Sequence, residues 1–239
     1  AIIATCWLVL TGTQAITSAG DTARFGATLL RTLAPLQLSL AVLAAAMTAA
    51  VAVSVEKDRR TLELLLLSSL TERELVLGKL AASLLRVMLM LISAIPVFGI
   101  AALFGGVTGT QLGRLFIVTA AAALSAASIA TTVAFWKDTT FQAVAITAFA
   151  LVAWIVTGEA VATWFGPSFG EQISPARAMF AALSPAGGNL SSFLGLCGLI
   201  IVGTNLIAIR QVRNWNMARD ARRAAQARGT GESTRLYRK

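Results

Sequence analysis

Residues 56–79, EKDRRTLELLLLSSLTERELVLGK, form a charged segment of 24 residues, which we call the island. Residues 32–55 before it comprise 24 positions without a charged side chain, and residues 87–113 after it comprise 27. Each uncharged segment is long enough to cross about 30 Å of hydrocarbon, which takes about 20 helical residues. The island is therefore predicted to connect two transmembrane helices at the membrane surface, where a soluble partner can contact it.

The island divides into two helical halves. Residues 61–70 contain six leucines in a helical pattern. Thr71 and Glu74 then have the spacing of a capping box, in which each side chain accepts a hydrogen bond from the other residue's backbone N–H. We expect a break near residues 68–70 and a second helix that continues into the next span. From these residues alone, the simpler interpretation is a linker that only joins two spans.

Composition independently indicates an integral membrane protein. Of the 239 residues, 56% are hydrophobic and 13% are charged, whereas soluble domains carry about a quarter charged residues. The chain has no histidine, which excludes Ser-His and Cys-His catalysis and removes the commonest metal ligand. Cys6 and Cys197 both lie in apolar runs, so neither a disulfide framework nor a metal-binding spacing is predicted.

Hydropathy predicts an all-α integral membrane fold with six transmembrane helices. Residues 1–209 form the predicted transmembrane domain, and residues 210–239 form a basic tail. The polar residues 17–31 are predicted to form the first loop. The predicted spans are residues 1–16, clipped at the N-terminus, 32–55, about 86 to a turn at 105–109, 115–136, 139–158 and 189–209.

Two sequence features predict how the spans are shaped and packed. Pro96 is predicted to kink the third span, because it removes a backbone hydrogen bond inside the helix. Small residues four positions apart let another helix approach closely. Alanines with this spacing occur in the second and fourth spans, at Ala45, Ala46, Ala49, Ala50, Ala122, Ala126 and Ala130.

A proline-containing segment, residues 159–188, precedes the sixth span. Ser174 and Pro175 have the pattern of an N-cap followed by proline at the first helical position, so a short helix is predicted to run to about Leu183. This helix is too short to cross a membrane. We therefore expect an interfacial or re-entrant helix on the side opposite the island.

Basic residues divide unequally between the two sides that six spans define. The island, Arg86, the Lys137 turn and the tail together carry 16 Lys and Arg, and the opposite side carries 4. Because cytoplasmic loops are enriched in Lys and Arg, the island and the tail are predicted to be cytoplasmic. The tail has nine basic and two acidic residues. We expect it to lie on anionic membrane lipids rather than to bind nucleic acid.

The island also carries a family resemblance. Its residues Glu56, Lys57, Asp58, Arg59, Thr61, Leu62, Glu63, Leu65, Leu66 and Ser68, followed by Leu70, Thr71, Arg73, Glu74, Leu75, Leu77, Gly78 and Lys79, resemble a loop of the ABC-2-type permeases. These permeases are the membrane subunits of ABC exporters, and the loop lies between their second and third helices. Arg60 stands where Gly is common in that family, and Ser69 stands where Pro is common. The missing Pro makes the break between the two halves less sharply defined.

The resemblance implies a partner and a role for the island. In that family the loop is a cytoplasmic coupling helix that docks into an ABC ATP-binding subunit, and a second permease copy or a related permease completes the path. The expected contacts with the ATP-binding subunit are Glu56, Asp58, Arg59, Glu63, Leu65, Leu66, Glu72 and Arg73. ATP is expected on that partner, and no cofactor or metal on this chain. The resemblance also implies a plasma membrane, such as a bacterial inner membrane.

The sequence contains no recognisable energy source of its own. No Asp, Glu or Lys is predicted in mid-membrane, since Glu159 lies at a predicted span end, and no Walker sequence is found. The resulting prediction is a non-enzymatic permease subunit driven by a separate ATPase. Two alternatives remain open, a membrane scaffold or assembly factor and an intramembrane lipid enzyme that would use Glu159 and Glu171. The spans suit drugs, lipids, peptides or glycans alike as substrates.

Overall fold

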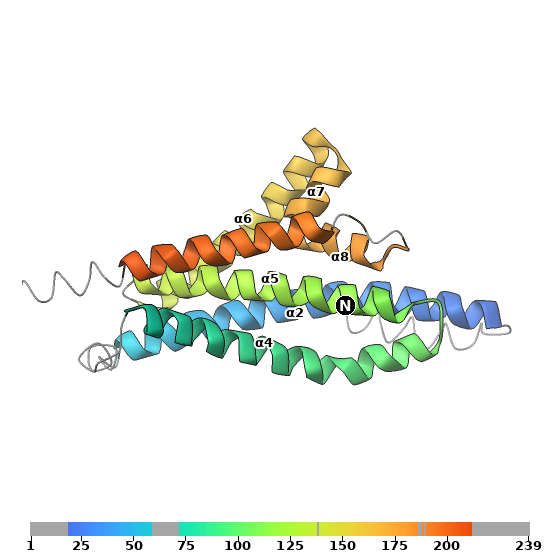
Figure 1. Cartoon of the computed structure of the whole chain (residues 1–239), viewed down its shortest axis with the longest axis horizontal. Helices are drawn as coiled ribbons and strands as arrows, with labels where there is room; N and C mark the ends of the chain where they lie inside the picture. The colour runs from blue at the N-terminus through green and yellow to red at the C-terminus, as the bar shows by residue number, and fades with distance from the viewer. Residues whose placement is uncertain (1–18, 59–71, 138, 186–187, 189, 212–239) are drawn as a thin grey trace, which may run out of the picture.

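The chain forms a bundle of long helices (Figure 1). A shorter arm projects from the bundle and consists of the end of the helix Thr140–Phe165 and the short helix Pro167–Ile173. The computed structural model describes residues 19–58, 72–137, 139–185, 188 and 190–211, and no strand occurs among them. The helices are α2 (Ala19–Asp58), α4 (Glu72–Leu103), α5 (Gly109–Trp136), α6 (Thr140–Phe165), α7 (Pro167–Ile173), α8 (Pro175–Leu183) and a final helix, Leu190–Gln211.

Five helices in the described part of the chain are long and apolar enough to cross a membrane. Their candidate spans are Asp21–Val55, Leu77–Leu103, Gly109–Trp136, Thr140–Phe165 and Leu190–Gln211. They indicate a multi-pass protein embedded in a membrane. The predicted first span, residues 1–16, lies outside the described residues.

The predicted first loop is wrong from residue 19 onward, because α2 begins at Ala19 and runs for 40 residues. Gly26, one of the predicted loop residues, lies inside the helix at a close contact. A Cβ on Gly26 would lie 2.5 Å from the backbone oxygen of Gly105. Gly26 therefore permits close packing against the turn after α4. Asp21 lies in the first turn of α2, where its negative charge is favourable for the helix dipole.

α4 confirms that the helix after the island continues into the next span, since it runs without interruption from Glu72 to Leu103. Pro96 lies inside α4, and the helix is bowed rather than straight (Figure 1). The predicted turn follows α4, with Gly105 and Gly106 at φ +87° and +78°. This left-handed conformation favours glycine.

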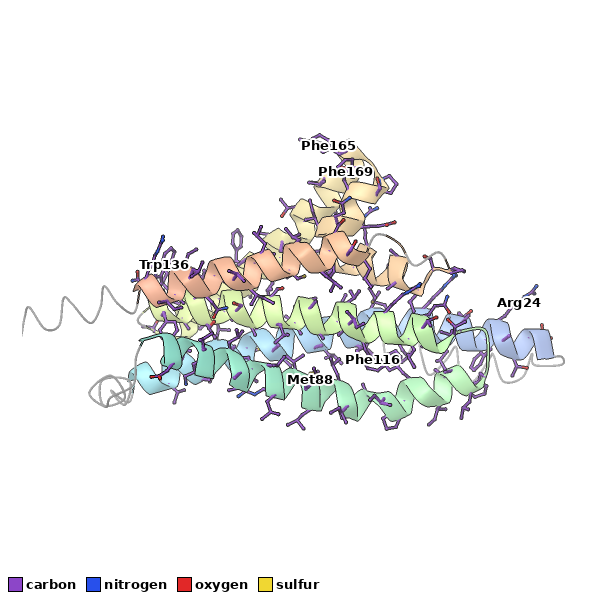
Figure 2. The ribbon with its side chains drawn as sticks, in the orientation of Figure 1. Arg24, Met88, Phe116, Trp136, Phe165 and Phe169 are labelled. Carbon is purple, nitrogen blue, oxygen red and sulfur yellow. The ribbon has the colours of Figure 1, made fainter. Side chains whose placement is uncertain are left out.

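α5 is the central helix of the bundle. It packs against α2, α4, α6 and α8, and 15 of its 28 residues are buried inside the protein. The predicted alanine positions on α2 and α5 are all buried in one apolar core, which confirms the expectation of close helix packing. By contrast, α4 and α6 expose many large apolar side chains on their outer faces, such as Met88 (Figure 2). Such faces suit contact with lipid.

The predictions for α6 and the proline-containing segment after it are correct in part. α8 begins after Ser174 with Pro175 in its first turn and ends at Leu183, as the sequence predicts. α6 extends to Phe165 rather than ending near residue 158, and α7 was not predicted. Phe165 and Phe169 lie together at the tip of the projecting arm, with ring centroids 6.4 Å apart (Figure 2).

Candidate functional site

The two ends of the bundle provide two candidate sites. At one end lie the C-terminal ends of α2, α5 and the final helix, together with the start of α4 (Figure 1). We call this the island end, because the island connects α2 to α4. The turn after α4, the start of α5 and the short helix α8 lie toward the opposite end, which we call the outer end.

The eight predicted ATPase contacts all lie in the island, whose two ends belong to α2 and α4. Glu56 and Asp58 belong to the last turn of α2, and Glu72 and Arg73 belong to the first turn of α4. The remaining four, Arg59, Glu63, Leu65 and Leu66, lie outside the described residues. The structure thus brings the two flanking helix ends to the same end of the bundle, and the contact face itself stays a prediction.

Both helices continue past their apolar spans toward the island. The candidate span of α2 ends at Val55 while the helix runs to Asp58, and the span of α4 begins at Leu77 while the helix begins at Glu72. α2 and α4 also pack against each other and against α5. Each of the two helices is therefore continuous from the island end into the core of the bundle.

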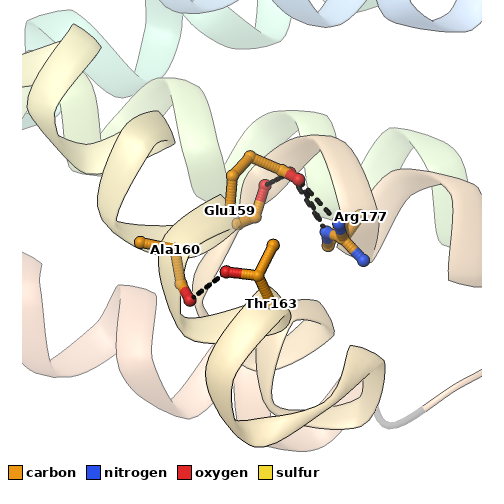
Figure 3. Close-up of polar contacts among 5 residues, drawn as sticks. Glu159, Ala160, Thr163 and Arg177 are labelled. Carbon is orange, nitrogen blue, oxygen red and sulfur yellow. Dashed lines mark hydrogen bonds and ion pairs between the residues drawn. The ribbon is translucent and has the colours of Figure 1, made fainter.

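At the outer end, an ion pair joins α6 to α8. Arg177 Nε donates hydrogen bonds to both carboxylate oxygens of Glu159, at 3.1 and 2.9 Å, and its Nη2 donates to Oε2 at 2.7 Å (Figure 3). Such a multiply bonded Arg–carboxylate pair fixes the orientation of both groups. The hydrogen bonds to Glu159 raise the pKa of Arg177 above its ordinary value, so the guanidinium stays cationic.

Three neighbours bring this pair together. Gly158 is buried, and a Cβ there would lie 2.7 Å from Cβ of Ser174, so only glycine lets α6 approach the α7–α8 junction this closely. The Ser174 hydroxyl donates to Oε1 of Glu159 at 3.2 Å. Trp154 on α6 donates its Nε1–H to the backbone oxygen of Ile173 at 3.0 Å, where α7 ends.

The ion pair lines a cleft of about 660 Å³. Glu171 from α7 and Phe180 from α8 also line it, and Glu171 lies close enough to Arg177 to interact with it electrostatically. The charged groups that line the cleft are two carboxylates and one guanidinium, so the cleft has a net negative charge. Among the described residues, no cluster of His, Cys, Asp and Glu could hold a metal ion.

The sequence prediction missed this cleft because it treated its residues separately. The sequence predicts Glu159 at a span end, whereas α6 continues to Phe165 and Glu159 lies inside its candidate span. A usable signal was present, since Gly166-Pro167 and Ser174-Pro175 mark two turns between residues of opposite charge 18 positions apart. Two turns within this short segment reverse the direction of the chain, so α8 comes back to lie beside α6.

Comparison with known proteins identifies no match. The chain matches no protein-family model, no curated protein and no solved structure.

Proposed function

We propose that this chain is the permease subunit of an ATP-driven exporter of the ABC-2 type. It moves its substrate with energy from a separate ATP-binding subunit, which docks on the island. The observation that carries the proposal is the pair of uninterrupted helices, 40 and 32 residues long, that flank the island.

The flanking helices give the island a mechanical connection to the membrane domain. An α-helix is hydrogen-bonded along its length, so a push on its end tilts or shifts the helix as a unit. α2 packs along the central helix α5, and a tilt of α2 therefore rearranges the core. A linker with no further role does not need this continuity beyond the apolar spans.

The charge distribution supports contact with a cytoplasmic partner. The island side carries 16 of the 20 basic residues, and such an excess favours the cytoplasmic side of a plasma membrane. The outer faces of α4 and α6 expose apolar side chains over much of their length. These faces suit lipid or a second permease copy in the assembled exporter.

The test is the simultaneous replacement of Arg59 and Glu63 by alanine. We expect normal membrane insertion but about tenfold less ATPase activity co-purifying with the tagged chain, since loss of two charged contacts at a protein interface weakens binding by this order. The matched control removes one basic and one acidic residue at the outer end, by Arg24→Ala with Glu171→Ala. Arg24 is exposed at the start of α2 (Figure 2).

Two results would count against the proposal. Equal co-purification of ATPase activity with both double variants would remove the assigned contact face. A stable cytoplasmic partner that neither binds nor hydrolyses ATP would instead favour the scaffold alternative.

A further inference from the structure

A second, apolar pocket adjoins the charged cleft. It has a volume of about 280 Å³ and lies between α2, α6 and the start of α8. Leu38 and Val42 on α2 line it from one side, and Val152 and Ile155 on α6 from the other. Its lining is almost wholly apolar, and its volume is close to the lower end of the range for small-molecule sites, about 300–1,000 Å³.

The apolar pocket and the charged cleft are neighbours. Ala176, in the first turn of α8, lines both of them. On α6, Val152 and Ile155 line the apolar pocket and Glu159 lines the cleft. Ile155 and Glu159 are four residues apart, so their side chains lie one above the other on the same helix face. One surface therefore passes from apolar to charged within a turn of helix.

This order matches the orientation of an amphiphile in one leaflet. α6 begins at the island end, so the apolar residues lie deeper in the bundle and Glu159 lies nearer the outer end. From Ala148, at the deep end of the pocket, to Glu159 is about 16 Å at 1.5 Å per residue. That length along α6 accommodates an apolar chain whose head lies beside Glu159.

The charges of the cleft indicate the type of head. Arg177 is engaged by Glu159 through three hydrogen bonds, and Glu171 lines the same cleft. The net negative charge favours a cation. We propose that α2, α6 and α8 bind an amphiphile whose headgroup carries an ammonium, with its chain in the apolar pocket and its head beside Glu159 and Glu171. This inference concerns binding alone and does not depend on the proposed function.

The test uses two photoreactive probes that differ only in their heads. Dodecyltrimethylammonium and dodecyl sulfate, each with a diazirine at the end of the chain, are added to the full chain in phosphatidylglycerol vesicles. We expect the ammonium probe to label pocket residues of α2 and α6. Glu171→Gln should weaken this labelling up to about fivefold, as expected for one ion pair near a surface, and should not weaken labelling by the sulfate probe.

A matched pair of variants tests the position of the chain. Val152 and Val156 are exposed to similar degrees, 57% and 59%, on the same helix, but only Val152 lines the apolar pocket. Val152→Trp should fill the pocket and reduce labelling at least about tenfold, whereas Val156→Trp should leave it unchanged. Because both side chains are already exposed, neither change disturbs the buried core, and an unaltered helical circular dichroism spectrum checks this.

The outcomes separate the candidate occupants. Competition by added phosphatidylethanolamine identifies a bilayer lipid as the source of the ammonium head. Labelling without such competition identifies an amphiphile from outside the bilayer. Equal labelling by the two probes, or equal effects of the two tryptophan variants, overturns the proposal. A disulfide formed between two copies of a Leu43→Cys variant also overturns it, because Leu43 lines the pocket and a second copy would then cover it.

Discussion

Gly158 determines how closely the junction between α7 and α8 packs on α6. Its position is filled on one side by Ser174, whose Cα, Cβ and backbone nitrogen would all lie within 3.0 Å of an added Cβ. Two of these three atoms belong to the backbone, so the neighbour cannot move aside by rotating its side chain. The glycine therefore fixes the distance between α6 and the α7–α8 junction, and with it the geometry of the Glu159–Arg177 pair.

We expect Gly158→Ala to destabilise the protein by about 1–3 kcal/mol, as is typical of overpacking a buried site. The reason is that the junction must move away from α6. The ion pair should loosen with it. Thermal unfolding in detergent would measure the loss.

Gly195→Ala in the final helix provides the control for this substitution. Nothing lies within 4 Å of a Cβ at Gly195, so alanine there should be neutral or stabilising by up to about 1 kcal/mol through its better helix propensity. Opposite signs for the two changes are the specific expectation. A stabilising effect at both positions would show that the contact with Ser174 does not limit the packing.

Ser174 shows how far residue-level prediction from the sequence extends. The Ser-Pro pair correctly predicts the start of α8, because proline at the first helical turn lacks an N–H that the helix does not need. The hydroxyl, however, makes no cap bond and donates to Glu159. That choice depends on a partner 15 residues away, which no local pattern contains.

At the scale of elements, a polar contact joins α5 to the final helix within an apolar environment. Asn205 donates through Nδ2 to Oγ of Ser128 at 2.6 Å, and the hydroxyls of Ser128 and Thr204 are 2.7 Å apart. Thr132 donates to the backbone oxygen of Thr204 at 3.0 Å. Because lipid offers no competing hydrogen bonds, such contacts hold helices together where apolar burial contributes little.

A double-mutant cycle on Ser128→Ala and Asn205→Ala should give a coupling free energy of about 0.6 kcal/mol, the average for hydrogen bonds between membrane helices, and no more than about 1.7 kcal/mol. Unfolding in mixed micelles is a suitable measurement. Ser125 serves as the comparison, because it is buried on the same helix and bonds to the backbone oxygens of Ala121 and Cys197 rather than to Asn205. Equal coupling of Asn205 to Ser125 and to Ser128 would contradict the assigned contact.

The elements that the sequence predicts well are those with a local signal. The alanine spacing on α2 and α5, the glycine turn after α4 and the Ser-Pro start of α8 each follow from a few neighbouring residues. The extension of α6 and the presence of α7 do not. Gly158 and Glu159 suggest a span end by composition, but tertiary packing against Ser174 and Arg177 allows the helix to continue to Phe165.

At the scale of the whole molecule, the two ends differ in charge and in shape. The helix ends that the island and the basic tail follow in sequence lie at the island end, α8 lies toward the outer end beside the charged cleft, and the end of α6 projects sideways with α7 (Figure 1). Between them, α4 and α6 expose apolar surface around the bundle. For the proposed exporter we expect one orientation, with the island end on the cytoplasmic side.

Single cysteines at the two ends test this orientation, in a background where Cys6 and Cys197 are alanine. Gly109 is exposed at the outer end, and a Cβ there meets no atom within 4 Å. Thr139 is exposed at the island end and caps α6, which tolerates the roughly 1 kcal/mol that losing a cap costs. A membrane-impermeant maleimide should label Gly109→Cys in intact cells and Thr139→Cys only after permeabilisation. Labelling of Thr139→Cys in intact cells would place the island outside the cell, where no ATP-binding subunit can reach it, and the proposed coupling would then be excluded.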